Sequence, residues 1–340
     1  MALAAAALFG AATPSSKALL VSLSAFQLAG LLYLGGAAGV IPLLLRKKDL
    51  AAPWHFTKNT RVRLLGAVFF GGCLGPVFLL LGLRIASSSS VALWLNLELF
   101  ATALLGQIFF RDRLTKPAAV SVALTLAAAT LLSASEGDAG IRAGVLVLLA
   151  CLCWGIDNHL TALIDGISPA ETTFWKSIAA GMVNFMIGIW VAPLHAPAMV
   201  VGLAVVVGVL AYGISIVLYI ASAQQLGAIR SQIVFSSSPF FGVLFSTLFL
   251  GESLSLLQVS AIVLLAIALS LLAVERHVHE HRHEPVEHVH RHHFKDRHHA
   301  HEHGIGVASG WHSHWHVHQE WVHSHFHRPD LHHRHTHGEP

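Results

Sequence analysis

Charged side chains are scarce in this 340-residue chain. Asp, Glu, Lys and Arg together make up 11% of it, whereas they make up roughly a quarter of an ordinary soluble domain. Hydrophobic residues reach 54%, and most charged side chains lie in short connections or after residue 274. The first 274 residues therefore cannot hide their apolar surface in one water-soluble core, and we expect a lipid bilayer around them.

Cysteine is equally rare, and the motifs of several enzyme classes are missing. The three cysteines, Cys73, Cys151 and Cys153, lie in apolar runs, which indicates buried thiols rather than a disulfide framework. No Gly-rich phosphate loop precedes a helix, and no nucleophile, base and orienting group can be assembled. Before residue 275, no basic and aromatic pattern argues for nucleic acid. We expect no enzymatic activity, no required cofactor and no nucleic-acid partner.

The sequence does contain apolar runs long enough to cross the ~30 Å hydrocarbon core as helices. The first run starts at the initiator methionine without a basic region before it, which predicts a retained helix rather than a cleaved signal peptide. Ten spans are predicted, at about residues 1–21, 26–45, 64–83, 89–110, 117–134, 143–164, 170–192, 200–223, 229–250 and 255–274.

Basic residues predict the orientation of these spans. Arg46, Lys47 and Lys48 end the second span, and three more basic residues follow before the third. By the positive-inside rule this loop is cytoplasmic, in the cell (inner) membrane, which also places both termini in the cytoplasm. Because five is an odd number, a second set of five spans enters from the opposite side, as in the inverted repeats of secondary transporters.

One stretch of the sequence occurs twice, at residues 86–114 and 226–254. Each copy opens with a small or polar turn, continues through about twenty mostly apolar residues, and ends in an acidic residue before a leucine. Phe100 aligns with Phe240, and the spacing stays constant along the stretch. The repetition indicates a duplicated bundle of membrane helices.

These observations predict an all-α integral membrane protein in three parts. Ten transmembrane helices form two inverted five-helix repeats, residues 1–136 and 141–274, and a disordered His-rich cytoplasmic tail follows, residues 275–340.

Several short motifs recur along the two halves. They are Phe9-Gly10 followed by Lys17, Trp154-Gly155, Ser168-Pro169 before a helix with Lys176, and the endings Arg111-Asp112-Arg113-Leu114 and Gly251-Glu252-Ser253-Leu254. Their order and spacing over residues 1–274 resemble the EamA-like permeases of the drug/metabolite transporter superfamily. The resemblance implies ten helices around a central cavity, alternating access, and a small solute as substrate, often moved outward.

The two copies of the repeated stretch depart differently from the Glu-Pro pair that is common in the fourth helix of that family. The first copy has Glu98 before Leu99, and the second has Ser238 before Pro239. We therefore expect Glu98 to supply a charge in the first copy, and Ser238-Pro239 to break the helix in the second, since proline blocks a helical hydrogen bond.

Four ionisable residues, Lys17, Glu98, Asp157 and Lys176, lie inside predicted spans. Burial of such a group in a membrane helix costs about 2.5 to 3.5 kcal/mol at the centre, so it normally faces a cavity or a partner. Glu98 lies near the midplane, where it would contact a cationic or polar substrate or take up a proton; the alternative is a structural ion pair with Lys17 or Lys176. The residues predicted for the transport pathway are Lys17, Asn96, Glu98, Asp157, Lys176, Gln225, Ser238 and Pro239.

The sixth predicted span also carries potential metal ligands. Cys153 and Asp157 share one helix face, whereas His159 is rotated by about 160° from Asp157. One helix alone therefore cannot present all three side chains to one ion. A structural polar patch and a metal path completed by Glu98 or Gln225 both remain open.

The tail holds most of the 26 histidines, many in His-x-His alternation. In an extended chain such pairs lie on one side and can chelate one ion, and neutral imidazole suits Zn, Ni, Co and Cu. We expect several exchangeable sites for Zn, Ni or Co, weakened as the pH falls through ~6.5. The alternatives are a solvating segment and aromatic contacts with the membrane interface. The predicted ligands are His277, His279, His281, His283, His288, His290, His292, His312, His314, His316, His318, His323, His325 and His327.

Three functions fit the sequence. The first is a secondary transporter that exports a small solute and has a metal-binding cytoplasmic tail. The second is an exporter of a divalent metal ion, Ni, Co or Zn, which the tail collects. The third is a membrane-tethered metal store or sensor without transport. A homodimer is left open.

Overall fold

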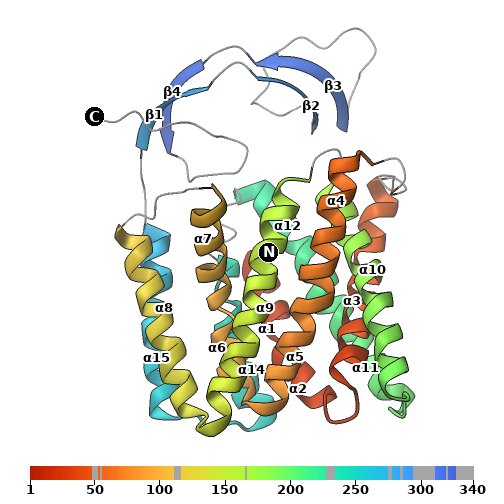
Figure 1. Cartoon of the computed structure of the whole chain (residues 1–340), viewed down its shortest axis with the longest axis vertical. Helices are drawn as coiled ribbons and strands as arrows, with labels where there is room; N and C mark the ends of the chain where they lie inside the picture. The colour runs from red at the N-terminus through yellow and green to blue at the C-terminus, as the bar shows by residue number, and fades with distance from the viewer. Residues whose placement is uncertain are drawn as a thin grey trace.

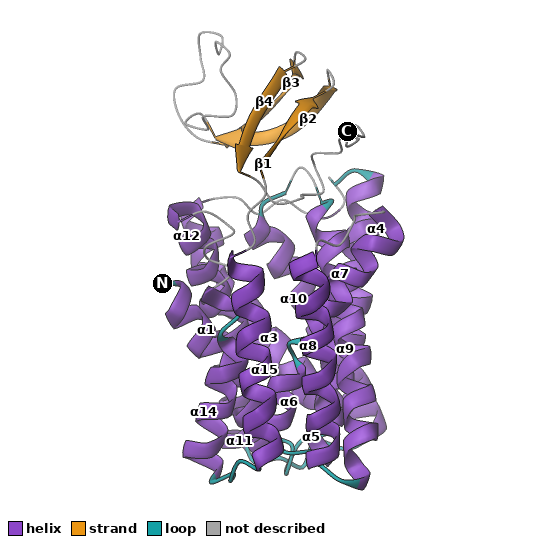
Figure 2. Cartoon of the chain, turned by 90° about the vertical axis from the view of Figure 1, so that its left-hand side faces the viewer, coloured by secondary structure: helices purple, strands orange, loops and turns teal. Residues whose placement is uncertain are grey.

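The computed structural model shows an elongated helical bundle with short strands beyond one end (Figures 1 and 2). The residues that the structure describes are 1–47, 53, 56–110, 116–164, 167–226, 234–274, 278–283, 286–293, 311–318 and 321–326.

The helices follow the predicted spans in chain order. The first half contains α1 (Ala2–Gly10), α2 (Ala12–Leu19), α3 (Ala25–Lys47), α4 (Lys58–Ala67), the π-helix η2 (Val68–Leu74), α5 (Gly75–Ile85), α6 (Ser88–Trp94), α7 (Leu97–Phe110) and α8 (Lys116–Ser135). The second half contains α9 (Asp138–Ala162), α10 (Pro169–Val191), α11 (Ala198–Val207), the π-helix η3 (Gly208–Ile214), α12 (Ser215–Leu226), α14 (Ser238–Leu250) and α15 (Leu256–Val274).

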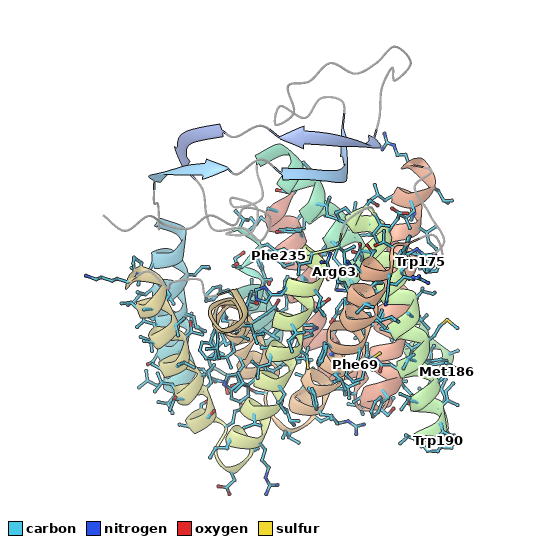
Figure 3. All side chains as sticks on the ribbon, turned by 45° about the horizontal axis from the view of Figure 1, so that its top comes forward. Arg63, Phe69, Trp175, Met186, Trp190 and Phe235 are labelled. Carbon is cyan, nitrogen blue, oxygen red and sulfur yellow. The ribbon has the colours of Figure 1, made fainter. Side chains whose placement is uncertain are left out.

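Five helical rods among the described residues are long and apolar enough to cross a membrane. They are Ala25–Arg46, Lys58–Ile85, Asp138–Thr161, Pro169–Val191 and Ala198–Ser222. The other predicted spans correspond to shorter or interrupted helices. Large apolar side chains such as Met186 and Trp190 point outward from α10 and are 59% and 88% exposed (Figure 3). Such an outer surface suits lipid rather than water.

Local sequence signals set several helix ends. Ser168 begins α10 with a reciprocal capping box in which its hydroxyl accepts from the Glu171 backbone N–H and the Glu171 carboxylate accepts from the Ser168 N–H, at 3.2 and 2.9 Å. Thr57 caps α4 with its hydroxyl, which accepts from the N–H of Thr60 at 3.2 Å. Gly251 ends α14 with φ of 68°, a left-handed conformation that glycine adopts without strain.

Helices of the two halves pack directly on one another. α3 packs on α10 and on η3, and α8 packs on α15. Small residues permit the close approach of α3 to η3: a Cβ at Gly39 would lie 2.8 Å from the Cα of Gly213. Such contacts between small residues are the usual way in which membrane helices associate. The interface between the halves is therefore a packed helical interface and not a flexible junction.

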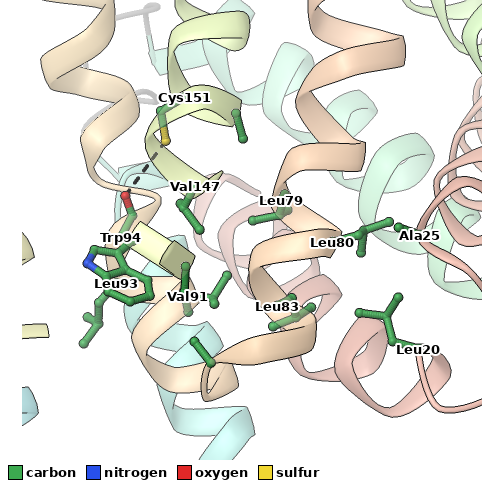
Figure 4. Packing of buried hydrophobic residues seen from close by; sticks show 14 of the residues in the cluster. Leu20, Ala25, Leu79, Leu80, Leu83, Val91, Leu93, Trp94, Val147 and Cys151 are labelled. Carbon is green, nitrogen blue, oxygen red and sulfur yellow. Dashed lines mark hydrogen bonds between the residues drawn. The ribbon is translucent and has the colours of Figure 1, made fainter. Parts of the chain in front are cut away.

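The largest buried cluster draws side chains from helices of both halves, and Figure 4 shows the part of it that contains Leu83, Val91 and Trp94. Leu83, Val91 and Trp94 are each at most 1% exposed. Trp94 donates its Nε1–H to the carbonyl oxygen of Ala129 at 3.2 Å, so its polar atom is satisfied inside the core. The described cysteines are free thiols, and Cys151 and Cys153 are buried as predicted, whereas Cys73, in the π-helix η2, is only half-buried.

Two π-helical turns occupy equivalent places in the two halves. Val68, the first residue of η2, and Gly208, the first of η3, are separated by the same number of residues as Phe100 and Phe240. The duplication predicted from residues 86–114 thus extends to an earlier pair of spans. π-Turns leave backbone groups without their usual helical partner and are frequent at functional sites.

Four strands are described in the tail: β1 (Val278–His283), β2 (Val286–His293), β3 (Trp311–His318) and β4 (Trp321–Phe326). β1 pairs with β4 and β2 with β3, both antiparallel. Disorder is the prediction for the tail as a whole, whereas these segments are extended. Their alternation of histidine with other residues matches the two-residue period of a strand.

Candidate functional site

A partly open pocket lies between the two halves, at the centre of the bundle. The free space inside it is about 10 Å³, roughly the room that one water molecule needs, so its own side chains nearly fill it. Its walls come from α1 and α2, α5, the connection between α6 and α7, α9 and η3, so both halves contribute. The lining residues are Phe9, Ala12, Thr13, Ser16, Leu79, Leu83, Leu95, Trp154 and Tyr212.

Aromatic rings continue from this pocket toward the end of the bundle that carries the tail. The rings of Phe9 and Tyr212 have centroids 5.8 Å apart, and Tyr33 follows on the other side of Tyr212 at 5.5 Å. Phe235, labelled in Figure 3, lies 5.4 Å from Phe9 and 5.0 Å from Tyr219. These five residues, which we call the aromatic wall, offer flat apolar surfaces with phenolic hydroxyls at intervals.

The fourth span is interrupted in both halves. In the first half, α6 ends at Trp94 and α7 starts at Leu97, and the buried Asn96 donates its amide to the Leu93 carbonyl at 2.9 Å. In the second half, a turn at 236–237 precedes α14, where Ser237 donates its hydroxyl to the Val234 carbonyl at 2.6 Å.

The interruption in the second copy lies just before Ser238-Pro239, and the first copy is interrupted as well. Pro239 lies in the first turn of α14, where its missing N–H costs no helical hydrogen bond. In the first half an asparagine side chain satisfies a carbonyl at the break without any proline, since asparagine readily bonds to nearby backbone. Ser238 is buried against α1, where its carbonyl faces the Cα of Gly10.

An ion pair lies beside the pocket. Lys176 Nζ of α10 is 2.7 Å from Asp157 Oδ2 of α9, and the side chains are 19% and 6% exposed. Thr161 donates its hydroxyl to the other carboxylate oxygen at 3.0 Å. Asp157 lies one turn after Trp154, which lines the pocket. A charged pair this little exposed requires each partner to neutralise the other.

The π-turn η2 supplies backbone acceptors next to this ion pair. The carbonyl of Gly71 accepts from the Tyr33 hydroxyl at 2.7 Å and from the Trp154 indole N–H at 3.0 Å. The next carbonyl, of Gly72, accepts from the Asn184 amide at 3.0 Å. A Cβ at Gly71 would collide with the Asp157 carboxylate. The absence of a side chain at Gly71 therefore leaves the space that the Asp157 carboxylate occupies.

Glu98 lies in the first turn of α7, after the break, and is half-buried. Its Oε1 accepts from the amide of Asn158 on α9 at 2.9 Å, and this amide is 3.5 Å from the Thr102 hydroxyl. Lys176 is engaged by Asp157 and Lys17 by backbone carbonyls, so the structure gives Glu98 a neutral partner in place of the alternative ion pair.

The potential metal ligands of α9 are not gathered around one point. Nε2 of His159 lies 3.1 Å from the Thr102 carbonyl, and Asp157 faces Lys176. Among the side chains that the structure describes, no group of three His, Cys, Asp or Glu residues could hold a metal ion.

Lys17 occupies a different place from the other pathway residues. Its Nζ donates to the carbonyls of Leu83 and Ala86, at 2.6 and 2.8 Å, at the end of α5. This end of the bundle lies away from the strands (Figure 1). A lysine on the last carbonyls of a helix is a favourable cap.

A cluster of serines at the start of α6 lies next to Lys17, and its partners were missed from the sequence. Glu252, just after α14 in the second half, accepts from the backbone N–H groups of Ser88 and Ser89, both at 2.8 Å, and from the Ser89 hydroxyl at 2.6 Å. Glu136 accepts from the N–H of Ser87 at 3.0 Å and from its hydroxyl. We call Ser87 to Ser90 with these carboxylates the serine clasp.

Two further side chains of the second half complete the serine clasp. Gln258 donates to the hydroxyls of Ser90 and Ser87 at 2.9 and 3.3 Å, and Ser246 donates to Ser88 at 2.9 Å. The signal in the sequence was the acidic residue that ends each repeated stretch together with the serine run that opens the first.

Some predicted residues lie at the limit of what the structure describes. Gln225 belongs to α12, but its side chain is outside the described residues, as are His277 and His327. The remaining twelve predicted ligands of the tail lie in β1 to β4.

Comparison with known proteins agrees with this architecture. A protein of Methanothermobacter thermautotrophicus, described as an uncharacterized transporter, is 25% identical over 220 residues, covering 61% of this chain and 63% of that relative. The chain thus spans less than two thirds of that relative's length. A solved crystal structure of another protein superposes with a TM-score of 0.54 at 18% identity over 78% of this chain and 96% of the other, which supports the fold alone.

The family itself is identified by the repeats. Residues 1–134 and residues 141–274 each match the model of the EamA-like transporter family. The predicted resemblance and the all-helical membrane fold are thereby confirmed, and the chain belongs to the EamA-like transporter family.

Proposed function

We propose that this transporter exports a small organic solute by alternating access, and that the solute binds in the central pocket beside Asp157 and Lys176. The observation that carries the proposal is the position of this little-exposed ion pair, one helical turn from a pocket that both halves line. Charged groups at membrane depth are costly and normally mark a substrate or ion pathway.

The lining of the pocket favours an organic solute. Its walls combine aromatic and aliphatic side chains with the hydroxyls of Thr13 and Ser16. Small-molecule sites commonly have such a mostly apolar lining with a few polar groups that orient the ligand. Asp157 and Lys176 would offer one partner of each sign to a solute that carries both an amine and an acid group.

The serine clasp supports a state that is closed at the end away from the tail. Glu252 and Gln258 of the second half form hydrogen bonds with the start of α6 in the first half. Opening this end by moving one repeat against the other would have to break these hydrogen bonds, which suits an exporter in which this end faces outward.

The tail and both termini are proposed to lie in the cytoplasm, since the end of α3, with Arg46 and Lys47, and the start of α4, with Lys58, lie at the same end of the bundle as the end of α15 (Figure 1). There the His-rich tail would bind Zn, Ni or Co through neutral imidazoles. The tail would regulate transport in response to these metal ions, or would buffer their concentration, while the helical bundle transports the solute.

Flux from proteoliposomes tests the proposal. Wild-type protein and a variant truncated after residue 275 are reconstituted into separate proteoliposomes. The vesicles are loaded with a panel of amino acids and amines, and in parallel with Zn, Ni and Co. We expect efflux of an organic solute from both proteins and efflux of no metal. Metal flux that disappears with the tail would instead support metal export, and no flux of any cargo would support a store or sensor.

A further inference from the structure

The paired strands of the tail place histidines opposite one another. In the sheet of β1 and β4, His279 is the partner of His325, and His281 is the partner of His323. In the sheet of β2 and β3, three pairs are opposed in the same way: His288 with His316, His290 with His314, and His292 with His312.

Strand geometry assigns these pairs to common faces. Residues two apart along a strand lie on the same face, and directly opposed residues of antiparallel strands share that face at a Cα separation of about 4.5 to 5.5 Å. His279, His281, His323 and His325 therefore share one face of the first sheet. The three opposed pairs share one face of the second.

The register joins parts of the chain that are distant in sequence. Residues 278–283 pair with residues 321–326, and the pairing of β2 with β3 lies between them in the chain. A His-x-His pair from one strand and another from its neighbour place four histidines at adjacent register positions on one face of the sheet. Zinc most often takes four ligands, with imidazole among those it prefers.

We propose that each sheet of the tail is a metal site built across its two strands, and that binding of a zinc-class ion holds together the segments on either side of residues 294–310. The first sheet offers one site with four histidines, and the second offers a row of six. This inference rests on the proposed metal binding by the tail, but it differs from binding by isolated His-x-His pairs because it depends on the strand register.

The register makes a composition-preserving test available. Exchanging His281 and Arg282, as His281→Arg with Arg282→His, moves one imidazole to the other face of β1 without changing the number of histidines. The matched control is His293→Asn, which removes a histidine that lies opposite Trp311 and not opposite another histidine. Zinc binding is titrated on the full-length protein in detergent at neutral pH, against a chromophoric chelator.

We expect the exchange to weaken zinc binding by the first sheet at least roughly tenfold, a free-energy change of about 1.4 kcal/mol, while the sites of the second sheet keep their affinity. The control should leave the sites of both sheets unchanged. Equal affinity of the exchange variant and the wild type would overturn the inference while leaving metal binding by the tail intact. Absence of zinc binding by the wild type would instead overturn the proposed metal binding itself.

Cross-linking gives a second measurement that leaves every histidine in place. Glu280 and Ser324 are opposed on the face that does not carry the histidine pairs. In Glu280→Cys with Ser324→Cys, zinc should accelerate disulfide formation. In the control, Glu280→Cys with Ser313→Cys, the second cysteine lies in the other sheet and zinc should have no such effect. Equal rates for the two pairs in the presence of zinc would contradict the register.

Discussion

The Nζ of Lys176 lies 2.7 Å from Oδ2 of Asp157, so an ion pair joins α10 to α9 beside the central pocket. The hydroxyl of Thr161 and the missing side chain at Gly71 complete the surroundings of the carboxylate. Three elements, α9, α10 and η2, thus meet at one acidic side chain, and a solute entering the pocket would encounter a site whose charges are already balanced.

Removal of one charge from this pair separates its structural and transport roles. Asp157→Asn leaves Lys176 without its partner and should destabilise the protein by about 3 to 5 kcal/mol, as for other buried pairs. The double variant Asp157→Asn with Lys176→Met should recover most of the thermal stability but no solute flux. Thermal unfolding in detergent and proteoliposome flux measure the two effects. Recovery of flux together with stability would show that the pair is structural only.

Gly71→Ala should disturb the same carboxylate from the backbone side. A methyl group at this position would occupy the place of the Asp157 side chain, and overpacking of this kind costs about 1 to 3 kcal/mol. We expect lower thermal stability and a large loss of solute flux. The matched control is Gly202→Ala, because no atom lies within 4 Å of a Cβ there. Similar behaviour of the two variants would contradict the described packing of η2 against α9.

Glu98→Gln should change the pH dependence of transport. The hydrogen-bond partner of the Glu98 carboxylate is the neutral amide of Asn158, which leaves the carboxylate able to gain a proton during the cycle. If it does, the variant transports at a rate that varies little with pH, whereas wild-type flux varies. Glu171→Gln, in the capping box at the start of α10, is the control and should keep the wild-type pH profile. An unchanged profile for Glu98→Gln would exclude this role.

Glu252→Gln should weaken the serine clasp. The variant loses the negative charge that faces two backbone N–H groups and a hydroxyl, and hydrogen bonds to charged groups contribute about 1.5 to 3 kcal/mol. A membrane-impermeant thiol reagent added outside should then label a cysteine at Thr13 in the pocket faster. The control is Asp138→Asn, which also removes one carboxylate but at the start of α9, and it should leave the labelling rate unchanged. Equal labelling with Glu252→Gln would show that the clasp does not limit access.

Sequence reasoning predicted the helical spans, since runs of about twenty apolar residues have few other stable structures. It also selected Asp157 and Lys176 by the cost of burying charge, but not their pairing, because the sequence does not show which faces of two helices meet. The π-turns were not predicted either: Val68–Leu74 and Gly208–Ile214 are as apolar as the α-helical segments around them.

Contacts between segments that are far apart in the sequence could not be predicted either. Glu252 was seen in the sequence as the end of a repeat, yet its partners Ser88 and Ser89 are more than 160 residues away. The break at Asn96 escaped prediction because it needs no proline, whereas the break before Pro239 carries a visible signal. Lys17, which the sequence predicts for the transport pathway, donates to backbone carbonyls at the end of α5, a contact that the sequence does not show.

Blocking the central pocket after folding is the most direct test of the account. A Thr13→Cys protein in which Cys73, Cys151 and Cys153 are replaced by alanine is purified, treated with a bulky thiol reagent and reconstituted for solute flux. We predict that the modified protein no longer transports, that the unmodified protein does, and that the transported solute slows the modification. Solute flux at the unmodified rate through the fully modified protein would contradict the proposed pathway.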